Sequence, residues 1–289
     1  MKQVKSCLCC NSKNVSKSPA IIMPFITHRI FGYEITSIDN SWNLHNFPTG
    51  ICLSQCFSSQ CQDCGFLFLD MRFDDEEMSN LYQDYRGEDY SIIRDKFEPG
   101  YLEKNKQIES GIKYKHDIEL FLSDLAEYKT ILDWGGDDGI NTPSFDADRV
   151  FIYDISGKKV LPNFQSIESD ELNSNDYDLV ICSNVLEHVS YPQEILSEIV
   201  SVMNKETILY IEVPYEKIMA DSFDSKNIFS NKRHWHEHIN FYSQKSLEEL
   251  LDKCGLKIVK QKIHSDSINT SVSNVSKLFM IACKLSFQN

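Results

Sequence analysis

The chain has 289 residues, of which 42% are hydrophobic, enough for one sizeable α/β domain and a smaller module. Its 43 acidic residues outnumber 29 basic ones, giving a net charge of −14. This charge argues against a nucleic-acid-binding surface, which needs cations to displace the counterions of phosphates, and favours a small-molecule substrate. No apolar run has the length of a membrane span and the first residues lack a signal-peptide core, so we expect a cytoplasmic protein without membrane insertion.

Seven of the ten cysteines lie in the first 64 residues, which marks this part of the chain as a separate unit. In a cytosolic protein such cysteines favour metal binding or buried thiols over disulfides. Cys7 and Cys10, and then Cys61 and Cys64, have the C-x-x-C spacing that lets two thiolates of one tight turn reach a single zinc ion. Two such turns complete a tetrahedral site.

The residues beside the cysteines bear on which of them bind. Asn11 and Gly65 follow the two turns, and both residue types tolerate a left-handed backbone there. This pattern favours Cys10 over Cys9 as a ligand. An alternative set takes two thiolates from just before the second turn instead: Cys52 and Cys56.

A polar stretch with several tyrosines follows and predicts a connector over residues 71–100. From Leu102 to Tyr128 apolar residues recur at helical spacing without a proline, which predicts a long helix leading into the first strand of the next domain. We therefore divide the chain into three parts: a zinc-binding module over 1–70, a helical connector and substrate-facing segment over 71–128, and a cofactor-binding domain over 129–289.

Residues 131–139, Ile-Leu-Asp-Trp-Gly-Gly-Asp-Asp-Gly, are the most informative stretch. An apolar run ends in the acid Asp133, a glycine-dense turn follows, and the sequence then becomes compatible with a helix. Glycines after a strand let the backbone approach a ligand closely. A second apolar run over 150–154 ends in Asp154, at the position where such folds hold ribose hydroxyls. This rhythm predicts a nucleotide-cofactor domain.

Further apolar runs extend the same α/β pattern toward the end of the chain. Strands are predicted over 177–182 and 208–214, and a helix over 191–203. Another helix over 246–254 ends before Gly255. Two closing strands flank the serine-rich turn 265–276, at 257–264 and 277–285.

At these residues the chain resembles the class I S-adenosylmethionine-dependent methyltransferases. The resemblance implies a Rossmann-like seven-stranded methyltransferase sheet behind the small N-terminal zinc-binding module, with S-adenosylmethionine as cofactor. Carried over residue by residue, Asp133, Gly135 and Gly139 hold the methionine part of the cofactor and Asp154 holds the ribose. Asp137 departs from the pattern, because it stands where the family has the middle glycine of G-x-G-x-G.

Three of the eight histidines lie together after the predicted strand 208–214. In an extended segment His234, His236 and His238 would share one face, so a second metal site is an alternative. A histidine-rich loop is more often hydrogen-bonded structure or catalytic machinery, and methyl transfer from a sulfonium donor needs no metal. His188, after the predicted strand 177–182, is interpreted as structural.

The run Glu237-His238-Ile239-Asn240-Phe241-Tyr242 resembles an element of the sugar C- and O-methyltransferases of bacterial polysaccharide and antibiotic pathways. In that group the histidine and its acidic neighbour serve near the acceptor, and a similar N-terminal cysteine module holds a structural zinc. We predict that His238 removes the acceptor's proton, since histidine titrates near working pH, and that Glu237 orients it.

The leading hypothesis is methyl transfer from S-adenosylmethionine to a small molecule, a nucleotide-linked or related sugar, with C- or O-methylation open. One alternative is a nicotinamide-dependent Rossmann oxidoreductase, which would also use a glycine turn and an acid after the second strand. The other is a non-catalytic binding protein that retains the methyltransferase fold.

Overall fold

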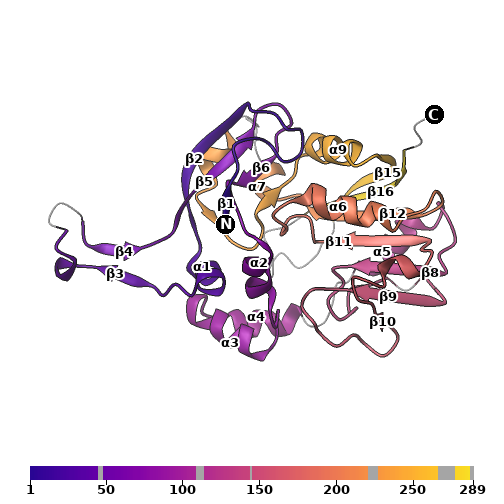
Figure 1. Cartoon of the computed structure of the whole chain (residues 1–289), viewed down its shortest axis with the longest axis horizontal. Helices are drawn as coiled ribbons and strands as arrows, with labels where there is room; N and C mark the ends of the chain where they lie inside the picture. Colours follow the sequence, from indigo (N-terminus) through magenta and orange to yellow (C-terminus); the bar gives the residue numbers. More distant parts are fainter. Residues whose placement is uncertain (45–47, 109–113, 144, 221–226, 266–276, 287–289) are drawn as a thin grey trace.

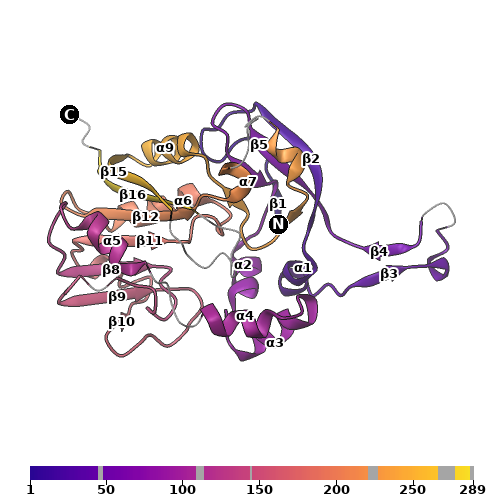
Figure 2. The same ribbon diagram turned by 180° about the vertical axis from the view of Figure 1, so that it is seen from behind.

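The computed structural model describes residues 1–44, 48–108, 114–143, 145–220, 227–265 and 277–286 (Figure 1). It contains a large sheet of seven strands and a smaller sheet of five strands beside it. A narrow β-ribbon projects from the smaller sheet, and Figure 2 shows the same arrangement from behind. Among the described residues, no helix combines the length and apolarity needed to cross a membrane.

The large sheet has the order β10-β9-β8-β11-β12-β16-β15. The first five strands in this order are parallel, and β16 runs antiparallel to both of its neighbours. This is the predicted Rossmann-like seven-stranded sheet. Its strands are β8 (Thr130–Trp134), β9 (Arg149–Tyr153), β10 (Gln165–Ser166), β11 (Leu179–Ser183), β12 (Ile208–Pro214), β15 (Leu256–His264) and β16 (Leu278–Leu285).

Alternate residues of these strands fill two cores. Leu132 and Val180 face a core shared with α6 (Pro192–Ser201) and α9 (Gln244–Lys253). Their neighbours on the other face pack with α5 (Lys115–Leu122). Helix α9 starts at a Ser243 capping box, and Gly255, with φ 70°, follows its end, as predicted.

Two predicted helical stretches differ from the structure. Residues 135–143 and 145–148, between β8 and β9, form turns rather than a helix. Pro143 disfavours helical geometry at Thr142, the residue before it. The Thr142 hydroxyl instead donates a hydrogen bond to the Asp133 carboxylate. The long helix expected over 102–128 is instead α4 (Tyr101–Ile108) and α5, and Tyr114 before α5 is not helical, with φ −101° and ψ 17°. Residues 109–113 lie outside the described part.

The smaller sheet combines strands from both halves of the chain, in the order β13-β2-β5-β6-β14. The segment 234–241 thus returns from the large domain and supplies the two outer strands. The strands are β2 (Val15–Ile22), β5 (Gln55–Cys61), β6 (Leu67–Leu69), β13 (His234–Trp235) and β14 (Asn240–Phe241).

Among the helices that share a separate core with this sheet, around Phe25, Tyr90 and Trp235, three lie between residues 24 and 97. The stretch 71–100, predicted as a polar connector, contributes two of them. They are α1 (Pro24–Phe31), α2 (Asp75–Tyr82) and α3 (Glu88–Phe97). Short elements complete the described fold: β1 (Lys2–Gln3), β7 (Met71–Arg72), the 3-10 turns at Asn40–Trp42 and Leu172–Ser174, α7 (Lys217–Ala220) and α8 (Ile228–Asn231).

Candidate active site and cysteine cluster

The glycine turn after β8 is closely packed. Gly135 has φ 81°, and a Cβ there would lie 2.5 Å from Cγ2 of Val185. Gly139 has φ 89°, and its Cβ would lie 2.4 Å from the ring of Phe164. Both positions therefore require glycine, because their backbone is left-handed and they have no room for a side chain.

Asp133 is buried at the end of β8, and its Oδ2 accepts a hydrogen bond from the Thr142 hydroxyl at 2.6 Å. Burial raises the pKa of Asp133 to about 7. The carboxyl lies directly beneath the glycine turn, since a Cβ on Gly136 would meet it at 2.8 Å. Sequence and structure thus place an acid and glycines together at the carboxyl end of the sheet.

Asp154 follows β9 and faces the same turn. Its Oδ2 accepts the backbone N–H of Asp137 at 2.9 Å, and its Oδ1 accepts that of Ser156 at 2.7 Å. Asp137, at the position of the family's middle glycine, has φ 54°, a conformation that aspartate tolerates better than most residues. Its carboxylate pairs with Nζ of Lys158 at 2.8 Å. The substitution therefore keeps the shape of the turn.

Glu212 on β12 is a buried carboxylate that the sequence analysis did not single out. It accepts hydrogen bonds from the hydroxyls of Tyr114 and Tyr210, both at 2.7 Å, and from Nδ2 of Asn184 at 2.8 Å. These hydrogen bonds offset the free-energy cost of burying the carboxylate. A single acid within an otherwise apolar strand is the signal that could have found it. Glu212 ties α5 to β11 and β12 below the site.

His238 lies between β13 and β14, and its Nδ1 is 2.6 Å from Oε1 of Glu216. Burial by itself would lower the pKa of His238, but the Glu216 hydrogen bond and the nearby Glu187 charge raise it overall. The ring also meets that of His188 edge-on, with centroids 4.7 Å apart. The acid that holds His238 is thus Glu216.

Glu237, the predicted partner of His238, faces α3 instead. Its Oε1 accepts hydrogen bonds from the Tyr90 hydroxyl at 2.5 Å and from Nη1 of Arg94 at 3.0 Å. Its Oε2 lies 3.5 Å from Nδ1 of His236. Burial would raise the pKa of Glu237, but His236 and Arg94 hold it well below its usual range. Glu237 therefore fixes the loop to α3 and makes no hydrogen bond to His238.

His188 and Glu187 follow β11 and complete a cluster with His238. Nδ1 of His188 lies 2.9 Å from the Tyr82 hydroxyl and 3.2 Å from the Glu237 carbonyl oxygen, and burial lowers the pKa of His188 to about 3. Among the described residues, neither carboxylate oxygen of buried Glu187 has a hydrogen-bond partner, and burial raises the pKa of Glu187 to about 8. Nε2 of His188 and Oε1 of Glu187 are 3.8 Å apart.

This cluster can accept a proton or hold a cation. One ligand atom from each of Glu187, His188 and His238 lies within 4.8 Å of the others. His234 is exposed and His236 contacts Glu98, so the three histidines of the loop form no common ligand group within the described residues. Of the residues in and around the cluster, the sequence singled out His238, Glu237 and His188, whereas it missed Tyr82, Glu187 and Glu216.

The predicted cysteines converge on one point at the base of the smaller sheet. Sγ of Cys7 lies 3.5 Å from that of Cys64, and Sγ of Cys10 lies 3.5 Å from that of Cys61. All four lie within 4.8 Å of one another. Four thiolates around zinc, with bonds near 2.3 Å, stand about 3.8 Å apart, so the spacing fits this metal.

The backbone around the cysteines supports the same set of ligands. Asn11 has φ 60° and Gly65 has φ 79°, and each donates its N–H at 3.0 Å to the carbonyl of the first cysteine in its turn. The alternative set disagrees with the structure, because Cys52 is exposed on the projecting ribbon and Cys56 lies in the other core. Cys9 is buried beside the cluster.

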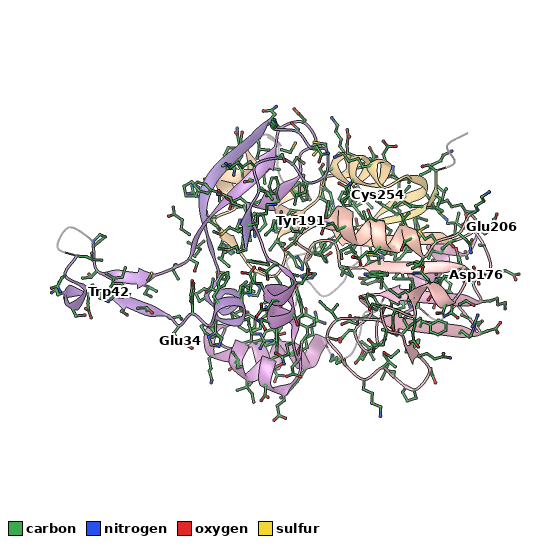
Figure 3. All side chains as sticks on the ribbon, in the orientation of Figure 1. Glu34, Trp42, Asp176, Tyr191, Glu206 and Cys254 are labelled. Atoms are coloured by element: carbon green, nitrogen blue, oxygen red, sulfur yellow. The ribbon has the colours of Figure 1, made fainter. Side chains whose placement is uncertain are left out.

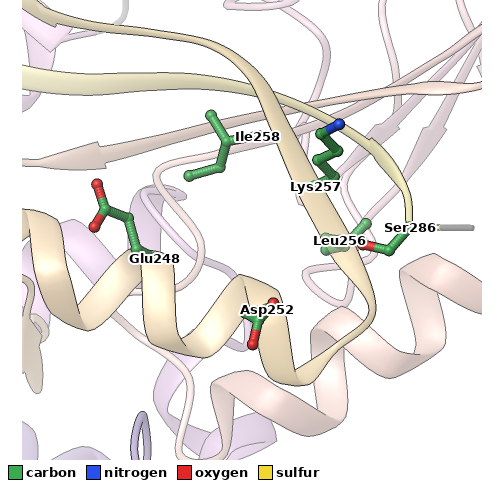
Figure 4. Close-up of a pocket in the computed structure, with 6 residues that line it drawn as sticks. All are labelled: Glu248, Asp252, Leu256, Lys257, Ile258 and Ser286. Atoms are coloured by element: carbon green, nitrogen blue, oxygen red, sulfur yellow. The ribbon is translucent and has the colours of Figure 1, made fainter. Parts of the chain in front are cut away.

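A hollow between α9 and β15 is lined by Glu248, Asp252, Lys257 and Ile258, among others (Figure 4). None of the predicted site residues lines it. The candidate active site therefore lies elsewhere, where β8, β9, β11 and β12 end.

Comparison with known proteins identifies the family. Residues 107–261, more than half of the chain, match the profile of a family described as Methyltransferase domain. No curated protein matches the sequence. Three similar solved structures cover large parts of the fold at low identity.

The first is 1,6-didemethyltoxoflavin-N1-methyltransferase of Burkholderia thailandensis, at 13% identity over 68% of this chain and 88% of that chain, with a TM-score of 0.45. The second is magnesium protoporphyrin IX methyltransferase of Synechocystis, at 14% over 68% and 99%, with a TM-score of 0.43. The third is an S-adenosylmethionine-dependent methyltransferase of Methanosarcina mazei, at 15% over 58% and 98%, with a TM-score of 0.41. The family match, together with the seven-stranded sheet, is decisive: the chain belongs to the methyltransferase-domain family and is an S-adenosylmethionine-dependent methyltransferase.

Proposed function

We propose that this methyltransferase acts on a nucleotide-linked or related sugar and methylates it at a carbon or an oxygen. The contact between His238 and Glu216 carries the proposal, because it provides a base beyond β12 with a carboxylate that favours its protonated form. The resemblance of the Glu237–Tyr242 run to sugar methyltransferases supports the choice of acceptor.

Four residues would hold S-adenosylmethionine, which supplies an electrophilic methyl group when bound. Gly135 and Gly139 leave the backbone open to close approach, and Asp133 sits directly beneath their turn. Asp154 would receive the ribose hydroxyls, since its carboxylate faces the turn from the end of β9.

His238 would remove a proton from a sugar hydroxyl or from a carbon beside a ketone. Its Nδ1 is engaged by Glu216, so Nε2 is the nitrogen that receives the proton. Glu216 then stabilises the imidazolium. Glu237 contributes by position, because its bonds to Tyr90 and Arg94 fix the loop that carries His238.

We further propose one structural zinc ion held by Cys7, Cys10, Cys61 and Cys64. The sulfur spacing and the two left-handed turns support it. Four protein ligands leave no open position for a reactive water, so such a metal would stabilise the fold and take no part in methyl transfer.

Replacement of His238 tests the proposed base. We expect His238→Ala and His238→Asn to lower turnover on the true acceptor by about 10²–10⁴-fold, the usual contribution of a general base. Affinity for S-adenosylmethionine, measured by calorimetry, should barely change. His234→Asn is the matched control, because that histidine is exposed on the preceding strand, β13. Near-normal turnover in the His238 variants would show that the base lies elsewhere, with His188 as the next candidate.

A further inference from the structure

A β-ribbon projects from the smaller sheet, and we call residues 33–44 and 48–53 the arm. Its strands, β3 (Thr36–Ile38) and β4 (Gly50–Cys52), pair over three positions only. Figures 1 and 2 agree that the arm projects away from the smaller and the large sheet. A ribbon this short is marginally stable in water, and among the described residues no hydrophobic layer packs against it. The arm therefore needs a surface beyond the described part of its own chain.

The arm is rich in exposed apolar side chains. Six of its large side chains are between 40% and 61% exposed, although scattered exposed apolar residues occur elsewhere in the molecule. They are Tyr33, Ile35, Trp42, Leu44, Ile51 and Leu53. Four of the six, Tyr33, Ile35, Trp42 and Leu53, line one groove. A group of this kind marks an interaction surface, whereas single exposed residues do not.

A groove runs beside the same side chains. Ile22, Pro24 and Thr27 line it at the base of the arm, and Tyr33 and Trp42 line it on the arm itself. Figure 3 labels Trp42 together with Glu34 on the arm. An apolar projection and an apolar groove thus adjoin in one region. This is the arrangement that a two-fold interface needs, where each copy offers the same patch to the other.

The charge of this region argues against nucleic acids and anionic membranes as partners. The sequence has no lysine or arginine between Arg29 and Arg72, and the arm carries the acids Glu34 and Asp39. Nucleic acids and anionic membranes are therefore repelled, the more so by a chain with net charge −14. The arm requires an apolar protein surface, and a second copy of the chain provides one at the base of its own arm.

We propose that the arm is a dimerisation element, which packs along the groove at the base of the arm in a second copy. Six large side chains at about half exposure offer roughly 600 Å² per copy. Reciprocal packing buries roughly 1,200 Å² in total, which reaches the range of specific protein interfaces. The proposal is independent of the acceptor and of the base assigned above.

Sedimentation of the full chain over a range of concentrations tests the proposal. The wild-type protein should be a dimer at about 10 µM, and Ile51→Asp or Trp42→Asp should raise the dissociation constant at least about 100-fold, since each places a charge in the apolar contact. Leu120→Asp is the matched control, because Leu120 is 57% exposed on α5, outside the arm. It should remain dimeric.

A cross-link provides a second measurement that does not depend on a destabilising variant. Cys52 is exposed and lines the groove, so a short thiol cross-linker should join two chains, and Cys52→Ser should abolish the product. A wild-type chain that stays monomeric to about 100 µM overturns the proposal, even where the arm binds another protein. A dimer that persists in both arm variants overturns it as well.

Discussion

His238 and Glu237 are neighbours in the sequence but have different partners, because successive residues of an extended segment point to opposite sides. His238 meets Glu216, which follows β12, whereas Glu237 meets Tyr90 and Arg94 of α3. An adjacent acid in the sequence predicts a charged site but not the pairing within it. The pairing depends on how the loop crosses between the two sheets.

The pH dependence of the reaction should reveal the Glu216 contact. The carboxylate favours the protonated imidazole, so the pKa of His238 lies above its ordinary value. Because the base acts in its neutral form, kcat/KM should rise with pH through this pKa. Glu216→Gln keeps an acceptor but removes the charge, so the rising limb should move to lower pH. Glu206→Gln, an exposed control, should leave the profile unchanged. If the rising limb of the Glu216→Gln profile does not move, Glu216 does not set the pKa of the catalytic base.

At the level of elements, the glycine turn is formed by β8 and held by its neighbours. The side chain of Val185, after β11, packs against Gly135, and the ring of Phe164, before β10, packs against Gly139. The turn therefore keeps its shape without the helix that was expected to follow it. Packing from two other segments replaces the support that a helix would give.

Alanine substitutions should distinguish the contribution of this packing to stability from the contribution of backbone strain. Gly157 also has a left-handed φ, 68°, but a Cβ there would meet no described atom within 4 Å. Gly157→Ala should lower the free energy of unfolding by about 1 kcal/mol, the cost of the backbone conformation. Gly135→Ala should cost about 1–3 kcal/mol more, because its Cβ overlaps Val185. Denaturant unfolding measures both, and Val185→Ala should recover part of the loss in the double variant. Equal losses at the two glycines would mean that packing does not hold the turn.

The central strands of the large sheet could be predicted because they are continuous apolar runs, whereas β10 contains no apolar residue and was not predicted. The run 208–214 matches β12 at both ends, and the helix predicted over 191–203 contains α6. β13 and β14 could not be predicted, since each has two residues and pairs with strands far away in the chain. The same distance hides the contact of Tyr82 with His188. Periodicity in the sequence identifies helices and strands that bury one face. It does not identify contacts between residues that are far apart in the chain.

At the scale of the whole molecule, the cysteine cluster lies between the smaller sheet and helix α9, which covers the large sheet. The Ser243 hydroxyl, which caps α9, donates to the Cys64 carbonyl at 2.5 Å, and Nζ of Lys245 donates to the Asp63 carbonyl at 2.8 Å. The ring of Phe66 lies 5.1 Å from that of Tyr242. The cysteines also share a core with the large sheet. The second cysteine turn therefore also supports the start of helix α9, in addition to its place beside the smaller sheet.

Loss of the proposed zinc should consequently weaken the packing of both sheets. Elemental analysis of the purified protein should find one zinc per chain, and a chelator should lower the Tm of the whole molecule. A destabilisation of about 3 kcal/mol corresponds to a fall of roughly 6–12 °C in a chain of this size. Calorimetry should show one transition that moves as a whole, because α9 loses the support of the Cys64 turn. Added zinc should restore the Tm. Cys61→Ser/Cys64→Ser should behave like the chelated protein, whereas Cys52→Ser, outside the cluster, should keep its zinc. A metal-free protein with an unchanged Tm would exclude the site, and a second, unmoved transition would show that the large sheet does not depend on it.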